Sequence, residues 1–180
     1  PLFVTSDGRV IAGDAKVVID DSALYRHPGF EATHDHFTSE IEYEAAQEGI
    51  PFLEFDGDIG LMCAGAGLTT TVYDLIHYAG GTVANYLEFG GPNYRKAVRA
   101  MELCLKAKSN VILVVTFGTI ARADVMAEGI VEAINRLKPD RPIVTCIRGT
   151  NEEEATEILK KAVLEPLFDT EKAAARDVET

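Results

Sequence analysis

The stretch from Val111 to Asp124 has the residue types and the spacing of an anion-binding turn. Val111 to Val115 is an unbroken apolar run, rich in β-branched residues, which is typical of a central parallel strand. Thr116-Phe117-Gly118-Thr119 predicts a turn, and an amphipathic helical pattern begins at Ile120. A helix that starts directly after a buried strand offers free backbone N–H groups and the positive end of its dipole, and Arg122 adds a positive charge in the first turn. The pattern therefore predicts that this turn holds an anion.

Glycine turns follow the other strands that the pattern predicts from residue 59 onward. These turns contain Gly65 and Gly67, Gly90 and Gly91, and Gly149, in addition to Gly118. Ligands of open α/β sheets bind beyond the carboxyl ends of the strands. A single glycine turn is common in any strand-to-helix connection, because glycine adopts positive φ and allows close backbone approach. Four such turns at one edge favour a binding site.

Two other functions compete with a phosphate or acid site. Gly65 and Gly67, with Glu88 about twenty residues later, resemble a dinucleotide fingerprint, although Thr70 stands where the third small residue belongs. The chain could therefore be an NAD(P)-binding module of the Rossmann type, or a non-catalytic association domain whose glycine turns are only structural. His77 lies within a predicted helix and the other histidines precede the domain, so no nucleophile–histidine constellation is expected and no catalytic residue is predicted.

Strand and helix patterns alternate from Ile50 onward and position these turns. Strands are predicted at 51–55, 59–64, 83–89, 111–115 and 142–147, with a further edge strand at 164–168, and amphipathic helices connect them. Asn151 is predicted to cap the helix after residue 151, with Glu154 in the capping-box position. Repeated βα units require parallel strands with right-handed crossovers. The fold class is therefore α/β, with an open doubly wound parallel sheet.

The first twenty residues predict a β-hairpin, because Asp7-Gly8 separates two apolar runs. The second strand is expected to continue to Ile19, with Asp14 and Lys16 on one face. A lone hairpin is marginal in water, so it should belong to a sheet that is completed elsewhere. Since the chain begins within a strand pattern, we expect it to be a fragment of a longer polypeptide. Residues 21–49 are predicted to be a linker, acidic and weakly helical from 38 to 48.

Composition excludes several classes of function. The 180 residues carry a formal net charge of −12, which argues against a nucleic-acid partner. No apolar run approaches the ~20 residues that span a bilayer, so no membrane association is expected. Cys63, Cys104 and Cys146 lie within apolar patterns without metal-ligand spacing, which indicates buried reduced thiols and a cytoplasmic protein.

The motifs taken together resemble the β subunit of succinyl-CoA synthetase, in the family of nucleotide-forming acyl-CoA ligases. The matching stretches, in register from Pro1 to Asn151, are Phe55 to Gly60, Gly65 to Leu68, Gly80-Gly81, Ala84 to Leu87, Gly90-Gly91 and Phe117 to Asp124. The resemblance implies the end of an ATP-grasp domain at 1–20, a linker at 21–49 and a flavodoxin-like ligase-CoA domain at 50–180. Asp14 matches a carboxylate that binds Mg²⁺ beside ATP or GTP. Its partner ligand would precede Pro1, so the chain as given should not bind nucleotide properly.

The resemblance also implies a partner and a reaction. In that family the flavodoxin-like domain packs against an α subunit that binds CoA and carries a phosphohistidine. Gly118, Thr119, Ile120, Ala121 and Arg122 match the helix N-terminus that holds the phosphohistidine. The implied reaction converts a carboxylate, CoA and a nucleoside triphosphate into acyl-CoA, the diphosphate and phosphate, as in the tricarboxylic acid cycle. The isolated chain is expected to be inactive, and the location to be the cytoplasm, or the mitochondrial matrix in a eukaryote.

Two positions depart from the family pattern where the carboxylate substrate binds. The turn just described contacts the acid, as does an Asn immediately before Gly65-Ala66-Gly67. That Asn is Ala64 here, and the second glycine of the family's Gly-Gly turn is Thr119. Both changes alter acid recognition, so an acid other than succinate is expected.

Overall fold

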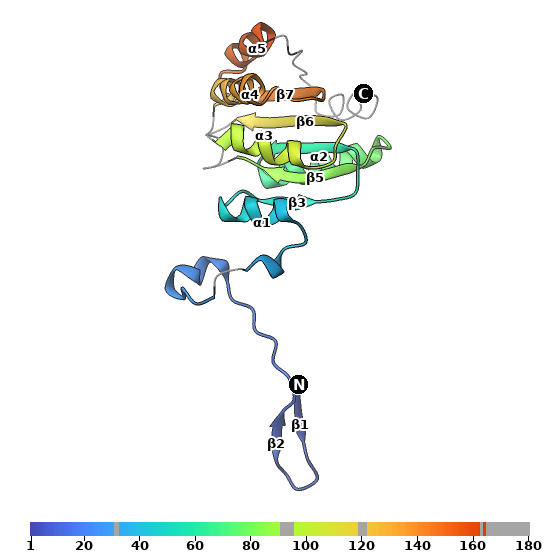
Figure 1. The fold of residues 1–180 in the computed structure, drawn as a ribbon, viewed down its shortest axis with the longest axis vertical. Helices are drawn as coiled ribbons and strands as arrows, with labels where there is room; N and C mark the ends of the chain where they lie inside the picture. Colours follow the sequence, from blue (N-terminus) through green and yellow to red (C-terminus); the bar gives the residue numbers. More distant parts are fainter. Residues whose placement is uncertain (31–32, 91–95, 119–121, 163, 165–180) are drawn as a thin grey trace. The chain divides into compact units, whose positions relative to one another are not determined.

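The structure is a computed structural model that describes residues 1–30, 33–90, 96–118, 122–162 and 164 (Figure 1). The chain divides into two units, Pro1–His36 and Phe37–Thr180. In the part of the chain that is described, no helix is long and apolar enough to cross a membrane.

The second unit is built on a five-stranded sheet with the order β3-β5-β4-β6-β7 (Figure 1). The strands are β3 (Phe52–Glu54), β4 (Ile59–Ala64), β5 (Val83–Glu88), β6 (Val111–Gly118) and β7 (Ile143–Gly149). β4 pairs in parallel with β5 and with β6, and β6 pairs in parallel with β7. This arrangement confirms the predicted α/β fold with an open, flavodoxin-like sheet.

One edge strand departs from the parallel pattern. β3 pairs with β5 in the antiparallel direction, with Phe52 opposite Leu87. Only residues 55–58 connect β3 to β4, whereas a parallel crossover needs a dozen residues or more. The short connection therefore forces β3 to run against its neighbour. At the other end of the chain, Leu164 is not in a strand, and the rest of the predicted strand 164–168 lies outside the described residues.

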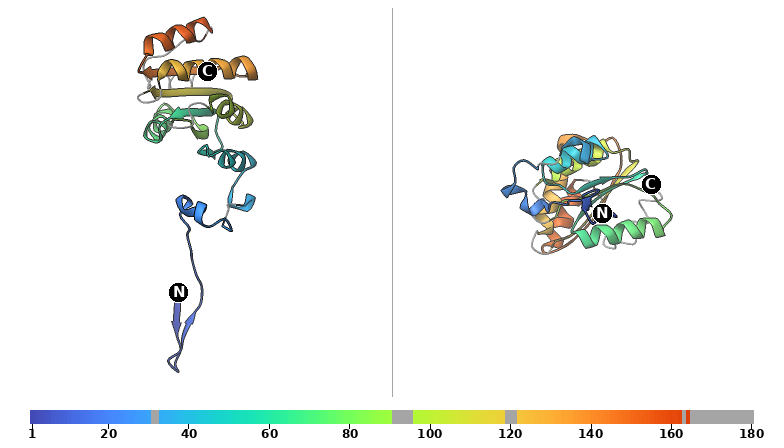
Figure 2. Two further views of the ribbon diagram at one scale, coloured as in Figure 1. Left: turned by 90° about the vertical axis from the view of Figure 1, so that its left-hand side faces the viewer. Right: turned by 90° about the horizontal axis from the view of Figure 1, so that it is seen from below.

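Helices cover both faces of the sheet. α2 (Ala66–Tyr78) packs Val72 and Ile76 on the face that carries Leu61 and Cys63. α3 (Ala97–Lys106) and α4 (Ala123–Leu137) pack on the opposite face, where they contribute to the core with Met62. In the right-hand view of Figure 2, α2 in green lies on the other side of the sheet from α1 in cyan. The thiols of all three cysteines are buried and reduced, as predicted.

Two further helices extend the layer formed by α3 and α4. α5 (Glu152–Lys161) packs against α4 and buries Ala155 and Leu159. α1 (Glu40–Gln47) lies within the stretch predicted as a linker and packs on β3 and α3. The buried Glu42 carboxylate ties α1 to β3, because its Oε1 accepts a hydrogen bond of 2.9 Å from the Glu54 backbone N–H. Arg99 of α3 pairs with Glu44 of α1 at 3.0 Å.

The first unit contains the predicted hairpin, formed by β1 (Leu2–Val4) and β2 (Val10–Ala12). β2 ends at Ala12 and does not continue to Ile19 as predicted. The Gly13 backbone N–H donates to the Pro1 carbonyl at 3.0 Å. Asp14 and Lys16 lie outside any strand. Short 3₁₀ helices follow at η1 (Asp21–Arg26) and η2 (His34–His36).

The close contact between the ends of β6 and β7 depends on Gly149. Gly149 has φ +118°, and a Cβ atom there would lie 2.0 Å from the Gly118 carbonyl oxygen. We expect Gly149→Ala to lower the free energy of unfolding by about 2 kcal/mol or more, because backbone strain and a backbone clash combine. Urea unfolding followed by circular dichroism measures the difference.

Gly67→Ala is the matched control. Gly67 lies inside α2 and a Cβ there would enter open space. Alanine should therefore raise the free energy of unfolding by up to about 1 kcal/mol through helix propensity. Equal stability of Gly149→Ala and the wild type would contradict the close-contact interpretation.

Candidate functional site

The candidate site lies where the chain direction switches between β4 and β6. These strands are adjacent, and Ala64 and Thr116 are Cα partners at their carboxyl ends. The helices that follow them leave on opposite faces, α2 on one and α4 on the other. A crevice outside the strand ends forms at such a switch point, and it is where open α/β sheets bind ligands. The fold therefore brings the predicted residues Ala64, Gly65 and Gly118 to one place.

The Glu88 carboxylate fixes the turns that follow β4 and β5. Glu88 Oε1 accepts hydrogen bonds from the backbone N–H of Gly65 at 3.0 Å and of Gly90 at 2.8 Å. Gly65 has φ +108° and is the N-cap of α2, without a side-chain cap. A Cβ on Gly90 would lie 2.9 Å from the Gly65 nitrogen. Glu88 thus locks the two turns together beside Ala64.

The position of Glu88 disfavours the dinucleotide alternative. In a Rossmann site the backbone N–H groups after the first strand bind the pyrophosphate, and the acidic residue binds a ribose. Here the Glu88 carboxylate itself accepts the hydrogen bond from the Gly65 N–H. The group that should bind ribose therefore fills the position that a pyrophosphate would need.

On the side of α4, the site carries the guanidinium group of Arg122. Arg122 is the N-cap of α4, with an extended backbone. The sequence pattern predicted that the helix begins at Ile120. This start is wrong, because β6 continues to Gly118 and α4 begins at Ala123. The Arg122 side chain is 54% exposed and the Asp124 side chain 12%.

Asp124 holds the Arg122 side chain. Arg122 Nε donates to Asp124 Oδ1 at 3.0 Å, and Nη2 pairs with Oδ2. Asn151 Nδ2 donates to the same Oδ2 at 3.2 Å. The hydrogen bonds from Arg122 lower the pKa of the Asp124 carboxyl to about 2, against the opposing effect of its burial. A guanidinium has five N–H donors, so the half-exposed Arg122 can bind an anion while it keeps this pair.

Backbone hydrogen bonds attach the start of α4 to the end of β7. The Thr150 N–H donates to the Gly118 carbonyl and the Ala123 N–H to the Thr150 carbonyl, each at 2.8 Å. Asn151 is the N-cap of α5 as predicted, but its φ is +64° and its side chain makes no capping bond. The predicted capping box is wrong, because the Asn151 amide bonds Asp124 instead. Glu152 Oε2 accepts from the Gly149 N–H at 3.2 Å.

Several predicted site residues lie elsewhere or outside the described part of the chain. Thr119, Ile120 and Ala121 are outside the described residues. Asp14 lies in the first unit, where its Oδ1 accepts from the Ala15 N–H at 2.7 Å. Within the described residues, no group of three or more His, Cys, Asp or Glu side chains could hold a metal ion. One carboxylate does not make a magnesium site, so Asp14 as a ligand stays a prediction and no step is assigned to it.

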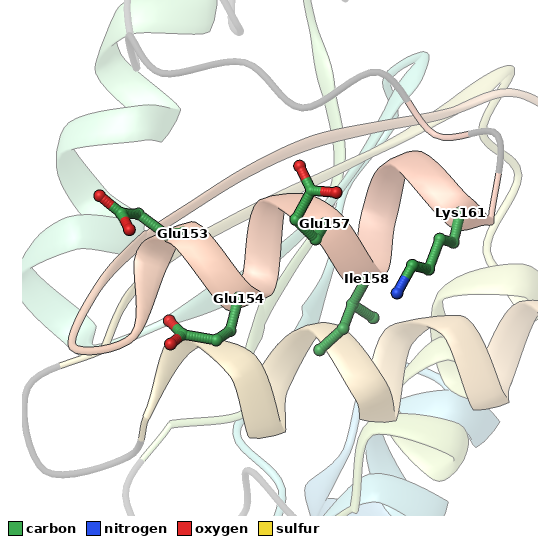
Figure 3. Close-up of a pocket in the computed structure, with 5 residues that line it drawn as sticks. All are labelled: Glu153, Glu154, Glu157, Ile158 and Lys161. Carbon is green, nitrogen blue, oxygen red and sulfur yellow. The ribbon is translucent and has the colours of Figure 1, made fainter.

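An open hollow on α5 does not have the chemistry of the predicted site. It is lined by Glu153, Glu154, Glu157, Ile158 and Lys161 and has a volume of about 380 Å³. Figure 3 shows the three carboxylates and the ammonium group projecting from one helix. Three carboxylates repel an anion, and the acidic residues at 152–154 are favourable for the helix start itself.

Sequence reasoning missed two supporting residues of the site. Asp124 follows Arg122 at a spacing that allows a local ion pair, which was a usable signal. Glu88 was considered only as part of the dinucleotide alternative, because its distance from Gly65 along the sequence says nothing about the Gly90 N–H that it also binds.

Comparison with known proteins identifies the family of the chain. Residues 62–179 match the CoA-ligase family model. The chain therefore belongs to the CoA-ligase family, as the motifs of the succinyl-CoA synthetase β subunit predicted.

Two similar relatives are named as subunits of ligases that act on a sulfonated acid. The chain is 73% identical over 173 residues to the ADP-forming sulfoacetate-CoA ligase subunit SqwK of Acholeplasma sp, covering 96% of this chain and 43% of that protein. It is 68% identical over 179 residues to the subunit SauC of Bilophila wadsworthia, named for the same reaction, covering 99% and 48%.

More distant relatives carry a different name. The chain is 43% identical over 179 residues to the β subunit of the ADP-forming succinate–CoA ligase of Ignicoccus hospitalis, covering 98% and 47%. The chain thus spans less than half the length of these curated relatives. Among solved structures, Methanosaeta concilii ATP citrate lyase is similar in fold, with a TM-score of 0.67 at 20% identity, covering 92% of this chain and 50% of that one.

The Asp124 carboxyl should make stability depend on acid pH. Its pKa is about 2 in the folded chain, below its ordinary value of 3.8, so its contribution to stability is present above about pH 4 and is lost as the pH falls towards 2. We expect Asp124→Asn, which keeps the shape and removes the charge, to lower stability at pH 5. Its stability should then fall less than that of the wild type between pH 4 and pH 2.

Urea unfolding at several pH values measures this dependence. Asp74→Asn, at an exposed position on α2, controls for the loss of one negative charge and should not flatten the profile. If stability depends on pH in the same way in Asp124→Asn and in the wild type, the Arg122–Asp124 pair does not form.

Proposed function

We propose that the chain is the partner-contacting part of a subunit of an ADP-forming acid–CoA ligase, and that its acid is sulfoacetate. The observation that carries the proposal is the switch point between β4 and β6, where Ala64 lies opposite Thr116. Identities of 73% and 68% to sulfoacetate-CoA ligase subunits, against 43% to a succinate–CoA ligase subunit, support the choice of acid.

In the proposed reaction this chain binds and orients anions. The positive end of the α4 dipole and the Arg122 guanidinium would hold the phosphohistidine of a CoA-binding α subunit, with the turn at Gly118 to Arg122 completing the cradle. The acid would lie beside it, over Ala64 and Gly65. Fixed donors and a positive dipole end stabilise the charge of a transferring phosphoryl group, so the chain needs no nucleophile of its own.

The remaining chemistry belongs to the longer subunit and its partner. ATP or GTP bound by the longer subunit would phosphorylate the partner's histidine, and Asp14 with further ligands would hold the Mg²⁺ that offsets the charge of the nucleotide phosphates. The phosphoryl group would then pass from the histidine to the acid carboxylate to form an acyl phosphate, and the CoA thiol would displace phosphate to form acyl-CoA. The 180-residue chain alone should be inactive in this reaction.

Ala64 explains the preference for a sulfonated acid. An Asn at this position offers an amide donor to a planar carboxylate, whereas Ala64 removes that donor and leaves more room. A sulfonate is tetrahedral, carries three oxygens and stays ionised at any pH at which the protein is folded. It therefore needs space and several weak donors more than one strong donor.

The acid can be identified by turnover of the complete enzyme. The full-length subunit is combined with its partner, and ADP formation is measured with CoA, ATP and either sulfoacetate, succinate, acetate or propionate. We expect kcat/KM for sulfoacetate to exceed that for succinate by about a hundredfold or more, because a site built for one anionic group leaves the other unpaired. No ADP formation with any acid, or a preference for succinate, would contradict the proposal.

Ala64→Asn should move this preference. The larger amide side chain would take up space beside Thr116, so we expect KM for sulfoacetate to rise about tenfold, with a smaller change or a gain for succinate. Leu53→Asn, at an exposed position on the edge strand β3, is the control and should leave both values unchanged. An unchanged ratio of kcat/KM values in Ala64→Asn would remove Ala64 from the acid site.

A further inference from the structure

Thr116, two residues before the carboxyl end of β6, has a buried hydroxyl group. Its side chain is 0% exposed. Within the described part of the chain, three buried side-chain oxygens have no hydrogen-bond partner, namely Asn85 Oδ1, Thr116 Oγ1 and Thr145 Oγ1. A buried hydroxyl without a partner destabilises the fold relative to a methyl group of the same shape. Each such oxygen in a native protein therefore calls for a specific explanation.

The strand pattern places this hydroxyl beside the candidate acid site. Side chains alternate along a strand, and Ile112 and Val114 of β6 belong to the core on the α3 and α4 side. Thr116 continues this row towards the start of α4. Its Cα partner on β4 is Ala64, which is 8% exposed and belongs to the same side of the sheet. The side chains of Thr116 and Ala64 are thus neighbours on adjacent strands at the switch point.

The other two oxygens lie away from the strand ends. Thr145 is opposite Val114, within the paired length of β6 and β7. Asn85 is opposite Gly60, and its Nδ2 donates to the Leu61 carbonyl at 3.0 Å. Neither residue is at the edge where a ligand binds. Thr116 alone of the three is placed to meet a substrate.

We propose that the Thr116 hydroxyl donates a hydrogen bond to the anionic head group of the acid, in the space left by Ala64. This inference rests on the proposed function and adds a specificity-determining residue to it. The ligand class is a small organic acid that ends in a sulfonate. A neutral hydroxyl suits this group, because a sulfonate is a weak base and accepts several modest hydrogen bonds. Binding of the acid supplies the partner that Thr116 Oγ1 lacks.

Thr116→Val tests the hydroxyl with little change in shape. In the full-length subunit with its partner, we expect KM for sulfoacetate to rise about tenfold or more, since a hydrogen bond to a charged group is lost. The KM values for CoA and ATP should stay unchanged. The melting temperature without acid should be equal or higher, because an unpartnered buried hydroxyl is removed. Thr116→Ser, which keeps the hydroxyl, should retain most of the wild-type affinity for sulfoacetate.

Thr145→Val is the matched control, because it removes the same kind of buried hydroxyl from the same side of the sheet. It should show a similar effect on melting temperature and no effect on KM for sulfoacetate. An equal rise of KM in both variants would mean that packing of the sheet, and not contact with the acid, is responsible. A sulfoacetate KM within twofold of the wild type in Thr116→Val would also overturn the inference.

A second measurement tests binding of the acid directly, in case the Thr116→Val enzyme turns over too slowly for KM to be measured. Sulfoacetate should raise the melting temperature of the wild-type complex by binding the folded state, and the shift should be much smaller in Thr116→Val. An undiminished shift would overturn the inference. The wild-type assay separates the two proposals: absence of sulfoacetate-dependent turnover rejects the acid, whereas normal wild-type turnover with an unaffected Thr116→Val rejects only the role of Thr116.

Discussion

The site depends on two parallel strands that lie side by side while the chain leaves them on opposite faces. β4 continues into α2 on one face, and β6 leads to α4 on the other. The two connections therefore diverge at Ala64 and Thr116, which is where open α/β sheets form an opening. Backbone contacts keep this opening in shape: Glu88 fixes the Gly65 turn, and Gly149 allows β7 to approach Gly118.

Charge is distributed around this opening in a way that suits a dianionic substrate in an acidic protein. The chain has a net charge of −12, which repels anions at long range. The nearby carboxylates are occupied, Glu88 by backbone N–H groups and Asp124 by Arg122 and Asn151. In the proposed arrangement, the acid meets a guanidinium, a helix N-terminus and a neutral hydroxyl. Local donors therefore act against the overall charge at short range, where they are strongest.

Regular periodicity predicted the central part of the fold well. The buried runs at 59–64 and 111–115 and the amphipathic helices gave the parallel sheet, because a doubly covered strand and a half-covered helix have distinct patterns. The direction of β3 followed from a four-residue connection that the pattern did not weigh. The end of β6 was placed too early, since Thr116 and Phe117 look like turn residues until their pairing with β7 is known.

The candidate site was predictable in position but not in its interactions. Gly118 and Arg122 came from motif and dipole arguments, and Ala64 from its departure from a family pattern. Asn151 looked like a helix cap by type, whereas its amide is used by Asp124, which is close only in three dimensions. Thr116 could not be recognised as a candidate from sequence, because its significance depends on a missing partner and on its register with Ala64.

The most direct test of the site is a crystal structure of the full-length subunit with its partner and bound sulfoacetate. The prediction is that the acid occupies the carboxyl ends of β4 and β6, with a sulfonate oxygen within hydrogen-bond distance of Thr116 Oγ1 and the carboxylate directed towards the start of α4. Sulfoacetate bound away from these strand ends, with Ala64 and Thr116 still covered by protein, would contradict it.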